Sequence, residues 1–202
     1  MSTIDDILDY RLPARLAELH TFVSLASALE TVEDDTLEIV IGPERFTLSK
    51  ARLLLDVVAD GAVVMSRTLL QFLGVSYHAG SSMLSAMRWL PDDIKITDLN
   101  LPPVSPTQAT SGLAAAQSRA EHLFKLCLDA GNKISAHFTT KNAMSQNASI
   151  SELTEAFQLV IELVNREVYR RLQRAPVVFG AGGAHGHITR QPVAEDQASP
   201  PA

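Results

Sequence analysis

The chain of 202 residues has a single cysteine, Cys127, and its 17 lysines and arginines are outnumbered by 23 aspartates and glutamates. One cysteine cannot form an internal disulfide, which favours a reducing compartment. The net charge of −6 argues against a generally basic nucleic-acid binder, so any basic surface has to be local. Cys127 is either a buried core thiol or a nucleophile, and its place on an apolar helical stripe favours the core.

Uninterrupted apolar stretches are missing as well. The most apolar run, Ala51–Gly74, contains four charged side chains, so it falls short of the roughly 18 apolar residues that a membrane-spanning helix needs. The N-terminus, MSTIDDILDY, is acidic where a signal peptide would be basic and then apolar. We therefore expect a soluble, cytoplasmic protein with no membrane partner.

What the sequence does have is hydrophobic periodicity at helical spacing. With 46% hydrophobic residues it can build the core of one domain. Apolar residues repeat at steps of three and four in these segments: 4–12, 13–30, 50–73, 111–140 and 150–175. We predict an all-α fold, a bundle of four or five main helices within residues 1–175.

Cap and turn residues mark where these helices begin and end. Pro13 suits the first turn of a helix, and Ser49 is a plausible N-cap for the helix that Gly74 ends. The sequence Ser149-Ile-Ser-Glu152 is a capping box, in which each side chain binds the other residue's free backbone N–H. This is the clearest helix boundary in the chain.

The segments between the helices carry turn formers. Residues 36–48, with Gly42-Pro43 in the middle, predict a small β-hairpin or an extended arm. Residues 76–89 predict a loop and a short helix capped by Ser81 or Ser82. Residues 91–110 predict a long connection with at most one short strand at 94–99, and a loop of that length is usually functional or mobile.

The last segment, residues 176–202, is rich in Gly, Pro, Ala and Ser and has no helical period. It predicts a flexible tail. Its PVVFGAGGAHG resembles a glycine-rich phosphate loop, but no periodic helix follows Gly186, so the tail is favoured over a nucleotide site. His185 and His187 offer only two ligands for a metal ion. We predict no metal and no cofactor.

The stretch from Ser111 to Thr140 combines the best amphipathic pattern with a polar cluster. Its core stripe is Leu113, Ala116, Ala120, Leu123, Cys127, Ile134 and Phe138. The adjoining flank holds Arg119, His122, Leu126, Lys133 and His137, and Asn132 projects to the opposite side. Gly131 costs a helix interior about 1 kcal/mol relative to Ala. It is either a packing position or a hinge, with Asn132 starting the next helix.

Four arginines crowd the end of the last helix, and two glutamates lie in its first turn; they are Arg166, Arg170, Arg171, Arg174, Glu152 and Glu155. The helix dipole favours this arrangement on its own account. Arginines are also suited to bidentate phosphate contacts, so the alternative is a face that contacts an RNA backbone, with Arg170 and Arg171 as candidates.

The segment GNKISAHFT resembles the R-N-x-x-x-x-H motif of HEPN-type proteins, an all-helical superfamily that includes toxin and phage-abortive-infection ribonucleases. Asn132, Lys133, Ala136 and His137 match a common form of the motif, and residues 50–173 match its helical pattern. The resemblance implies that His137 performs acid/base chemistry on a ribose hydroxyl, for which histidine has a suitable pKa. The family's arginine, which holds the phosphate, falls at Gly131.

Two classes of function follow. The first is a HEPN-like, catalytically weakened RNA-associated protein of a bacterial defence or toxin–antitoxin type, with His137 and Asn132 as catalytic candidates and Lys133, Arg119, Arg170 and Arg171 as RNA-binding candidates. The second is a non-enzymatic helical interaction or scaffold protein, in which His137 is an ordinary helix-flank histidine. A homodimer is expected in either case, because residues 50–73 are apolar on more than one face.

Overall fold

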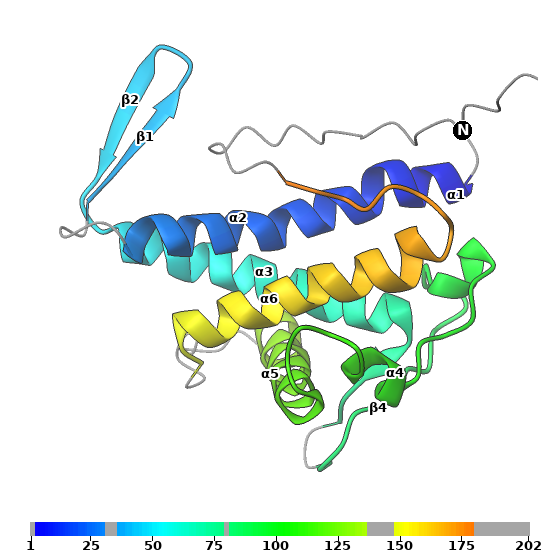
Figure 1. Cartoon of the computed structure of the whole chain (residues 1–202). Coiled ribbons are helices and arrows are strands. Elements are labelled where there is room, and N and C mark those ends of the chain that lie inside the picture. The colour runs from blue at the N-terminus through cyan, green and yellow to red at the C-terminus, as the bar shows by residue number, and fades with distance from the viewer. Residues whose placement is uncertain (1–2, 31–35, 79–80, 137–147, 180–202) are drawn as a thin grey trace, which may run out of the picture.

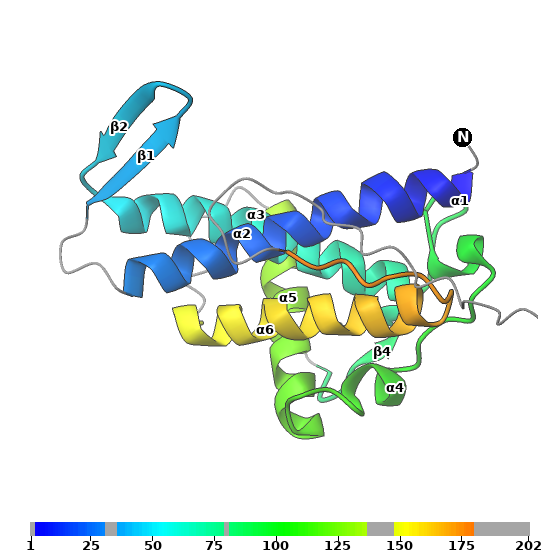
Figure 2. The ribbon, with the colours of Figure 1, turned by 45° about the horizontal axis from the view of Figure 1, so that its top comes forward.

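The computed structural model describes residues 3–30, 36–78, 81–136 and 148–179 of the chain. Its main helices are α2 (Leu12–Glu30), α3 (Ala51–Leu73), α5 (Gln117–Ala136) and α6 (Ile150–Val164). Helices α2, α3 and α6 run alongside one another and α5 crosses them steeply (Figures 1 and 2). The predicted helical bundle is confirmed. None of the described helices is long and apolar enough to cross a membrane.

The core lies where these four helices meet. Its largest fully buried side chains include Phe22 of α2, Phe124 of α5 and Phe157 of α6. The rings of Phe22 and Phe157 meet edge to face with their centroids 5.0 Å apart, an arrangement that aromatic pairs prefer. Among the described residues, the apolar stripes of α5 and α6 face this shared interior, as expected from their periodicity. The central helix begins at Gln117 and not at residue 111, so Leu113 and Ala116 of the predicted stripe lie before it, and Ala116 is exposed.

The two helices predicted at 4–12 and 13–30 form one continuous helical segment, so Pro13 does not start a new helix. α1 (Thr3–Asp6) runs into a π-helical turn, η1 (Ile7–Arg11), and then into α2. The N–H of Leu12 donates to the carbonyl of Ile7, five residues back. In that register the next donor to Leu8 would be Pro13, which has no N–H. The Tyr169 hydroxyl donates to the Leu8 carbonyl instead, at 2.8 Å.

The two ends of α3 are set by Lys50 and Gly74. It begins after Lys50, whose side chain makes no capping bond, so the predicted Ser49 cap is wrong by one residue. Gly74 ends it as predicted, with a left-handed φ of 110° and its N–H donating to the Gln71 and Leu70 carbonyls. A side chain at this φ would be strained, which is the physical reason for glycine at the C′ position.

The predicted hairpin is confirmed. β1 (Leu37–Ile41) pairs antiparallel with β2 (Glu44–Leu48), and Ile39 lies opposite Phe46. The hairpin extends away from the helices (Figure 1). Its faces differ in polarity, because Arg45 and Glu38 form an ion pair at 2.9 Å on one side while Phe46 lies half exposed on the other.

The connection from Val75 to Thr110 differs from its prediction. The described residues of 76–89, which are 76–78 and 81–89, form no helix; instead β3 (Val75–Ser76) pairs with β4 (Ser85–Ala86). The short strand expected at 94–99 is a 3-10 helix, η2 (Ile96–Leu99), and α4 (Pro106–Thr110) follows it with Ser105 as N-cap. Buried Ile96, Leu99 and Val104 anchor this segment to the core, so it is a packed connection within the described chain.

The last helix begins at the predicted capping box. Ser149 accepts from the Glu152 N–H, and the Glu152 carboxylate accepts from the Ser149 N–H. α6 continues through η4 (Asn165–Arg170). The Asn165 side chain then binds both the N–H and the carbonyl of Val177, which is buried. The folded part thus extends beyond residue 175, to Phe179, and the rest of the predicted tail lies outside the described residues.

Candidate functional site

Asn132, near the end of α5, is the predicted site residue that lies in a cavity. The cavity has a volume of ≈ 220 Å³, and we call it the Asn132 pocket. Its other lining residues come from the end of α3 and from the β3–β4 region: Gln71, Ser76, Tyr77, His78, Met87 and Arg88. His137 lies outside the described residues, as does the side chain of Lys133. The structure therefore tests neither of them as part of this pocket.

Close packing between α5 and α3 brings Asn132 to this place. A Cβ built on Gly131 would lie 2.9 Å from both Cβ and Cδ of Arg67 and 3.3 Å from the Val63 carbonyl oxygen. Only glycine allows this approach. Gln71 lies one helical turn beyond Arg67 on α3, so the contact sets Asn132 beside the Gln71 end of the helix. The hinge interpretation of Gly131 is wrong, since α5 continues through it to Ala136.

The opposite wall is held by the turn after α3. The Met87 N–H donates to the Gly74 carbonyl at 2.8 Å, and the Trp89 indole N–H donates to the Gln71 carbonyl at 2.7 Å. These two bonds fold the chain back on the C-terminal end of α3. Tyr77, His78 and Arg88 are thereby placed around one opening.

The chemistry of the pocket is polar and weakly basic. It combines a phenol, an imidazole, a guanidinium, two carboxamides and the buried Ser76 hydroxyl. Within the part of the chain that the structure describes, neither Arg88 nor His78 forms an ion pair, and both are exposed. Donors and acceptors of this kind, beside aromatic faces, suit a planar polar ligand that carries negative charge.

Arg119 is not a member of the pocket. Its guanidinium binds Glu155 at 2.7 Å and Glu152 at 3.2 Å, which fastens α5 to the start of α6. The hydrogen bonds that Arg119 donates to Glu155 raise the pKa of Arg119. The backbone N–H of Ser149, followed by Arg119, lowers the pKa of Glu152 despite some desolvation. Arg119 therefore forms an interhelical contact, and each of its three nitrogens donates to a carboxylate.

The arginines at the end of the last helix are mostly engaged too. Arg166 donates to the backbone carbonyls of Gln108 and Ser111, and Arg171 pairs with Glu167 at 3.3 Å. Arg174 binds Asp5 and Asp9 at 3.2 Å each. Arg170, Arg171 and Arg174 are all exposed, and Arg170 is the one of the four arginines that forms no ion pair among the described residues. Of the two RNA-binding candidates here, Arg171 is paired with Glu167, and Arg170 is unpaired among the described residues.

Cys127 is confirmed as a core thiol. It is fully buried, and burial raises its pKa to about 11, against a weaker opposing hydrogen bond with Ser66. The thiolate is the nucleophilic form, so this side chain is inert near neutral pH. Among the described residues no group of three or more His, Cys, Asp or Glu side chains could hold a metal ion.

Sequence reasoning missed Tyr77, His78 and Arg88. The segments SYH and MRW show no periodicity or motif that links them to Asn132. Only the position of Gly74, as a predicted helix end, indicated that the chain reverses just before Tyr77.

No protein-family model matches the chain, and no curated protein and no solved structure matches it. What the pocket does is therefore argued from its own geometry.

Proposed function

We propose that this protein is a HEPN-like RNA-associated protein that holds single-stranded RNA at the Asn132 pocket and cleaves it weakly or not at all. One observation carries the proposal: Asn132, part of the HEPN-like motif, shares a cavity with Tyr77, His78 and Arg88. A bacterial defence role and a cytoplasmic location belong to the same proposal and rest on the resemblance and on the single cysteine.

The pocket offers the contacts that single-stranded RNA uses. Base stacking on an aromatic side chain contributes about 1–3 kcal/mol per base, which Tyr77 and His78 can supply. Arg88 can bind a phosphate with paired N–H donors. The carboxamides of Asn132 and Gln71 suit the hydrogen-bonding edges of an unstacked base.

Weak catalysis is expected because the described residues bring one guanidinium to the pocket. The position of the family's arginine is Gly131, where the space for a side chain is already filled by Arg67. His78 is the imidazole that the described residues bring to the pocket, and Arg88 is the guanidinium. Transition-state charge on a phosphate is stabilised by prepositioned donors, and Arg88 lies on a solvent-exposed segment.

Fluorescence anisotropy with a labelled single-stranded decamer of mixed sequence tests the proposal. We expect Arg88→Gln to weaken binding by about tenfold, because a charge-assisted bond contributes about 1.5–3 kcal/mol. It should also lower the salt slope by about 0.7, the value for one phosphate contact on a single strand. A gel assay on the same oligonucleotide measures cleavage, with His78→Ala and Asn132→Ala as variants.

Lys50→Gln is the matched control, because it removes one positive charge at the far end of α3. If Lys50→Gln weakens RNA binding as much as Arg88→Gln does, the effect comes from the net charge of the protein and not from a contact at Arg88. Absence of binding at low salt would refute the RNA proposal. In that case the interaction-protein alternative is favoured.

We also propose a homodimer, from a different observation. Leu53 and Val57 lie one helical turn apart on α3 and are 58% and 70% exposed, and Phe46 on the neighbouring hairpin is 52% exposed. A lone two-stranded hairpin is marginally stable in water. A two-fold dimer would let the hairpin of each subunit cover the α3 stripe of the other, since a two-fold interface uses the same surface twice.

Light scattering distinguishes the dimer from a monomer of 21.9 kDa. Val57→Glu should yield the monomer. The control is Leu90→Glu, because Leu90 is 65% exposed and lies outside this stripe. If the wild-type protein is a monomer at micromolar concentration, the homodimer is refuted. A different protein would then be the expected partner of the exposed residues Leu53 and Val57.

A further inference from the structure

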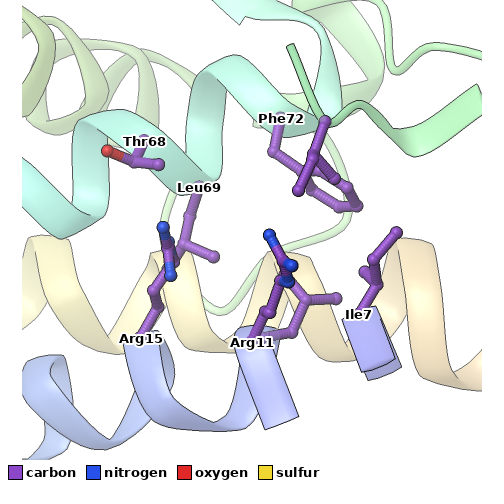
Figure 3. Close-up of a pocket in the computed structure, with 8 residues that line it drawn as sticks. Ile7, Arg11, Arg15, Thr68, Leu69 and Phe72 are labelled. Atoms are coloured by element: carbon purple, nitrogen blue, oxygen red, sulfur yellow. The ribbon is translucent and has the colours of Figure 1, made fainter. Parts of the chain in front are cut away.

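A second cavity, of ≈ 80 Å³, lies between the N-terminal helix and the C-terminal half of α3. We call it the arginine pocket. Its floor and walls are apolar and consist of Ile7, Leu12, Leu69, Phe72 and Ile94. Its polar lining residues are Arg11, Arg15 and Thr68. Figure 3 shows the two arginines extending in parallel from one side of the N-terminal helix toward Thr68, Leu69 and Phe72.

Arg11 and Arg15 lie on one face of the N-terminal helix, at the end of the π-helical turn and directly after it. Arg11 is the last residue of η1, and Arg15 follows four residues later in α2. Residues at that spacing lie on one helical face, so both guanidinium groups reach the same opening. Single π-turns inside α-helices occur frequently at functional sites.

The positive charge here is only partly neutralised. Arg11 pairs with Asp6 at 2.5 Å, and both side chains are partly exposed. The nearby Asp5 and Asp9 bind Arg174 instead. Arg15 is half-buried and forms no ion pair with any residue that the structure describes.

We infer that the arginine pocket binds the carboxylate of a short, unbranched aliphatic acid. Arg15 binds the carboxylate with two parallel N–H donors, the arrangement in which guanidinium pairs are strongest, and Arg11 adds its positive field. The alkyl chain lies against Leu69 and Phe72. A cavity of about 150 Å³ holds benzene, so the ≈ 80 Å³ here suits a narrow chain better than a ring. A monoanion matches one uncompensated guanidinium.

This inference concerns a different site from the Asn132 pocket and does not rest on the proposed RNA binding. The probes are pentanoate, 1-pentanol and acetate, titrated into the full chain while backbone amide shifts are followed by NMR. Pentanoate carries both the charge and the chain, and each of the others carries one of them. We expect pentanoate to bind at least tenfold more tightly than either, with the shifts centred on Thr68–Phe72.

Substitutions separate charge from packing. Arg15→Gln should remove the higher affinity for pentanoate than for pentanol. Arg15→Lys should keep part of that difference in affinity, because lysine retains the positive charge but lacks the paired N–H donors of arginine. Lys50→Gln, which removes one charge elsewhere on the surface, should leave the affinity within twofold. A melting curve for each variant confirms folding, and Arg15 has no described ion pair whose loss would unfold the chain. Pentanoate that binds no better than pentanol, or that is indifferent to Arg15→Gln, would overturn the inference.

Discussion

Two glycines inside helices, one closely packed and one exposed, test whether α5 crosses α3 as closely as the structure shows. Gly131 lies where α5 crosses α3, with Arg67 Cβ and Cδ only 2.9 Å from where its own Cβ would be. Gly61 lies on the exposed side of α3, and a Cβ there would meet nothing within 4 Å. Both residues are inside helices, so replacement by alanine changes backbone entropy by a similar amount at each.

The expected effects have opposite signs. Gly61→Ala should stabilise the protein by about 1 kcal/mol, the difference in helix propensity between glycine and alanine. Gly131→Ala gains the same amount of helix propensity, but it places a methyl group against Arg67 Cβ and the Val63 carbonyl oxygen. Neither of these atoms can move aside by a change of side-chain rotamer. Overpacking of this kind costs about 1–3 kcal/mol, so Gly131→Ala should be neutral to destabilising by about 2 kcal/mol.

The difference between the two variants is the quantity to measure, because helix propensity cancels in it. It should be about 1–3 kcal/mol by urea unfolding, or roughly 2–12 °C in Tm for a chain of this length. If Gly131→Ala stabilises the protein as much as Gly61→Ala, the close crossing of α5 and α3 is wrong, and so is the argument that places Asn132 beside Gln71. Gly131→Arg should disrupt the crossing and supply no phosphate ligand.

The remaining predictions concern single contacts, and each has its own measurement. Ser149→Ala should cost about 1 kcal/mol of unfolding free energy through loss of the cap, whereas Ser151→Ala, two residues further along and exposed, should cost little. Tyr169→Phe should cost about 1–3 kcal/mol, because the buried Leu8 carbonyl loses its donor. Burial lowers the pKa of His20 below its ordinary value of 6.5, so protonation favours the unfolded chain. The stability that neutral His20 contributes should be fully present above pH 6.5 and should fall as the pH drops from 6.5 toward the lowered pKa. In urea unfolding measured as a function of pH, His20→Gln should remove this fall in stability.

The sequence predicted what depends on neighbours along the chain. The stripes of α5 and α6 follow from the 3.6-residue period, and the capping box at Ser149 follows from the donors that every helix start leaves free. The hairpin at 36–48 is likewise local, with Gly42 at a φ of 60° in its turn. Gly74 was recognisable as a helix end for the same reason.

The errors come from partners that are distant in sequence. Pro13 looked like a helix start because its missing N–H costs least there, but the π-turn and Tyr169, more than 150 residues away, satisfy the backbone in another way. The segment 83–89 has a helical composition, yet the Met87 and Trp89 bonds to the end of α3 hold it extended. Asn165 fastens Val177 in a segment whose composition alone predicted a free tail.

The same distinction decides which cations are available to a ligand. An arginine's phosphate-binding capacity depends on whether carboxylates or carbonyls already occupy its N–H donors, and sequence spacing does not reveal that. Arg119 and Arg171 were predicted as RNA contacts from their place on a helix, but Glu155 and Glu167 occupy them. Breaking a partly buried pair to bind RNA would leave a carboxylate without its partner, which costs more than recruiting an uncommitted cation. Arg88 has no such competitor among the described residues and lies beside Asn132. For that reason it, and not the arginine-rich end of the last helix, is where we expect a phosphate to bind.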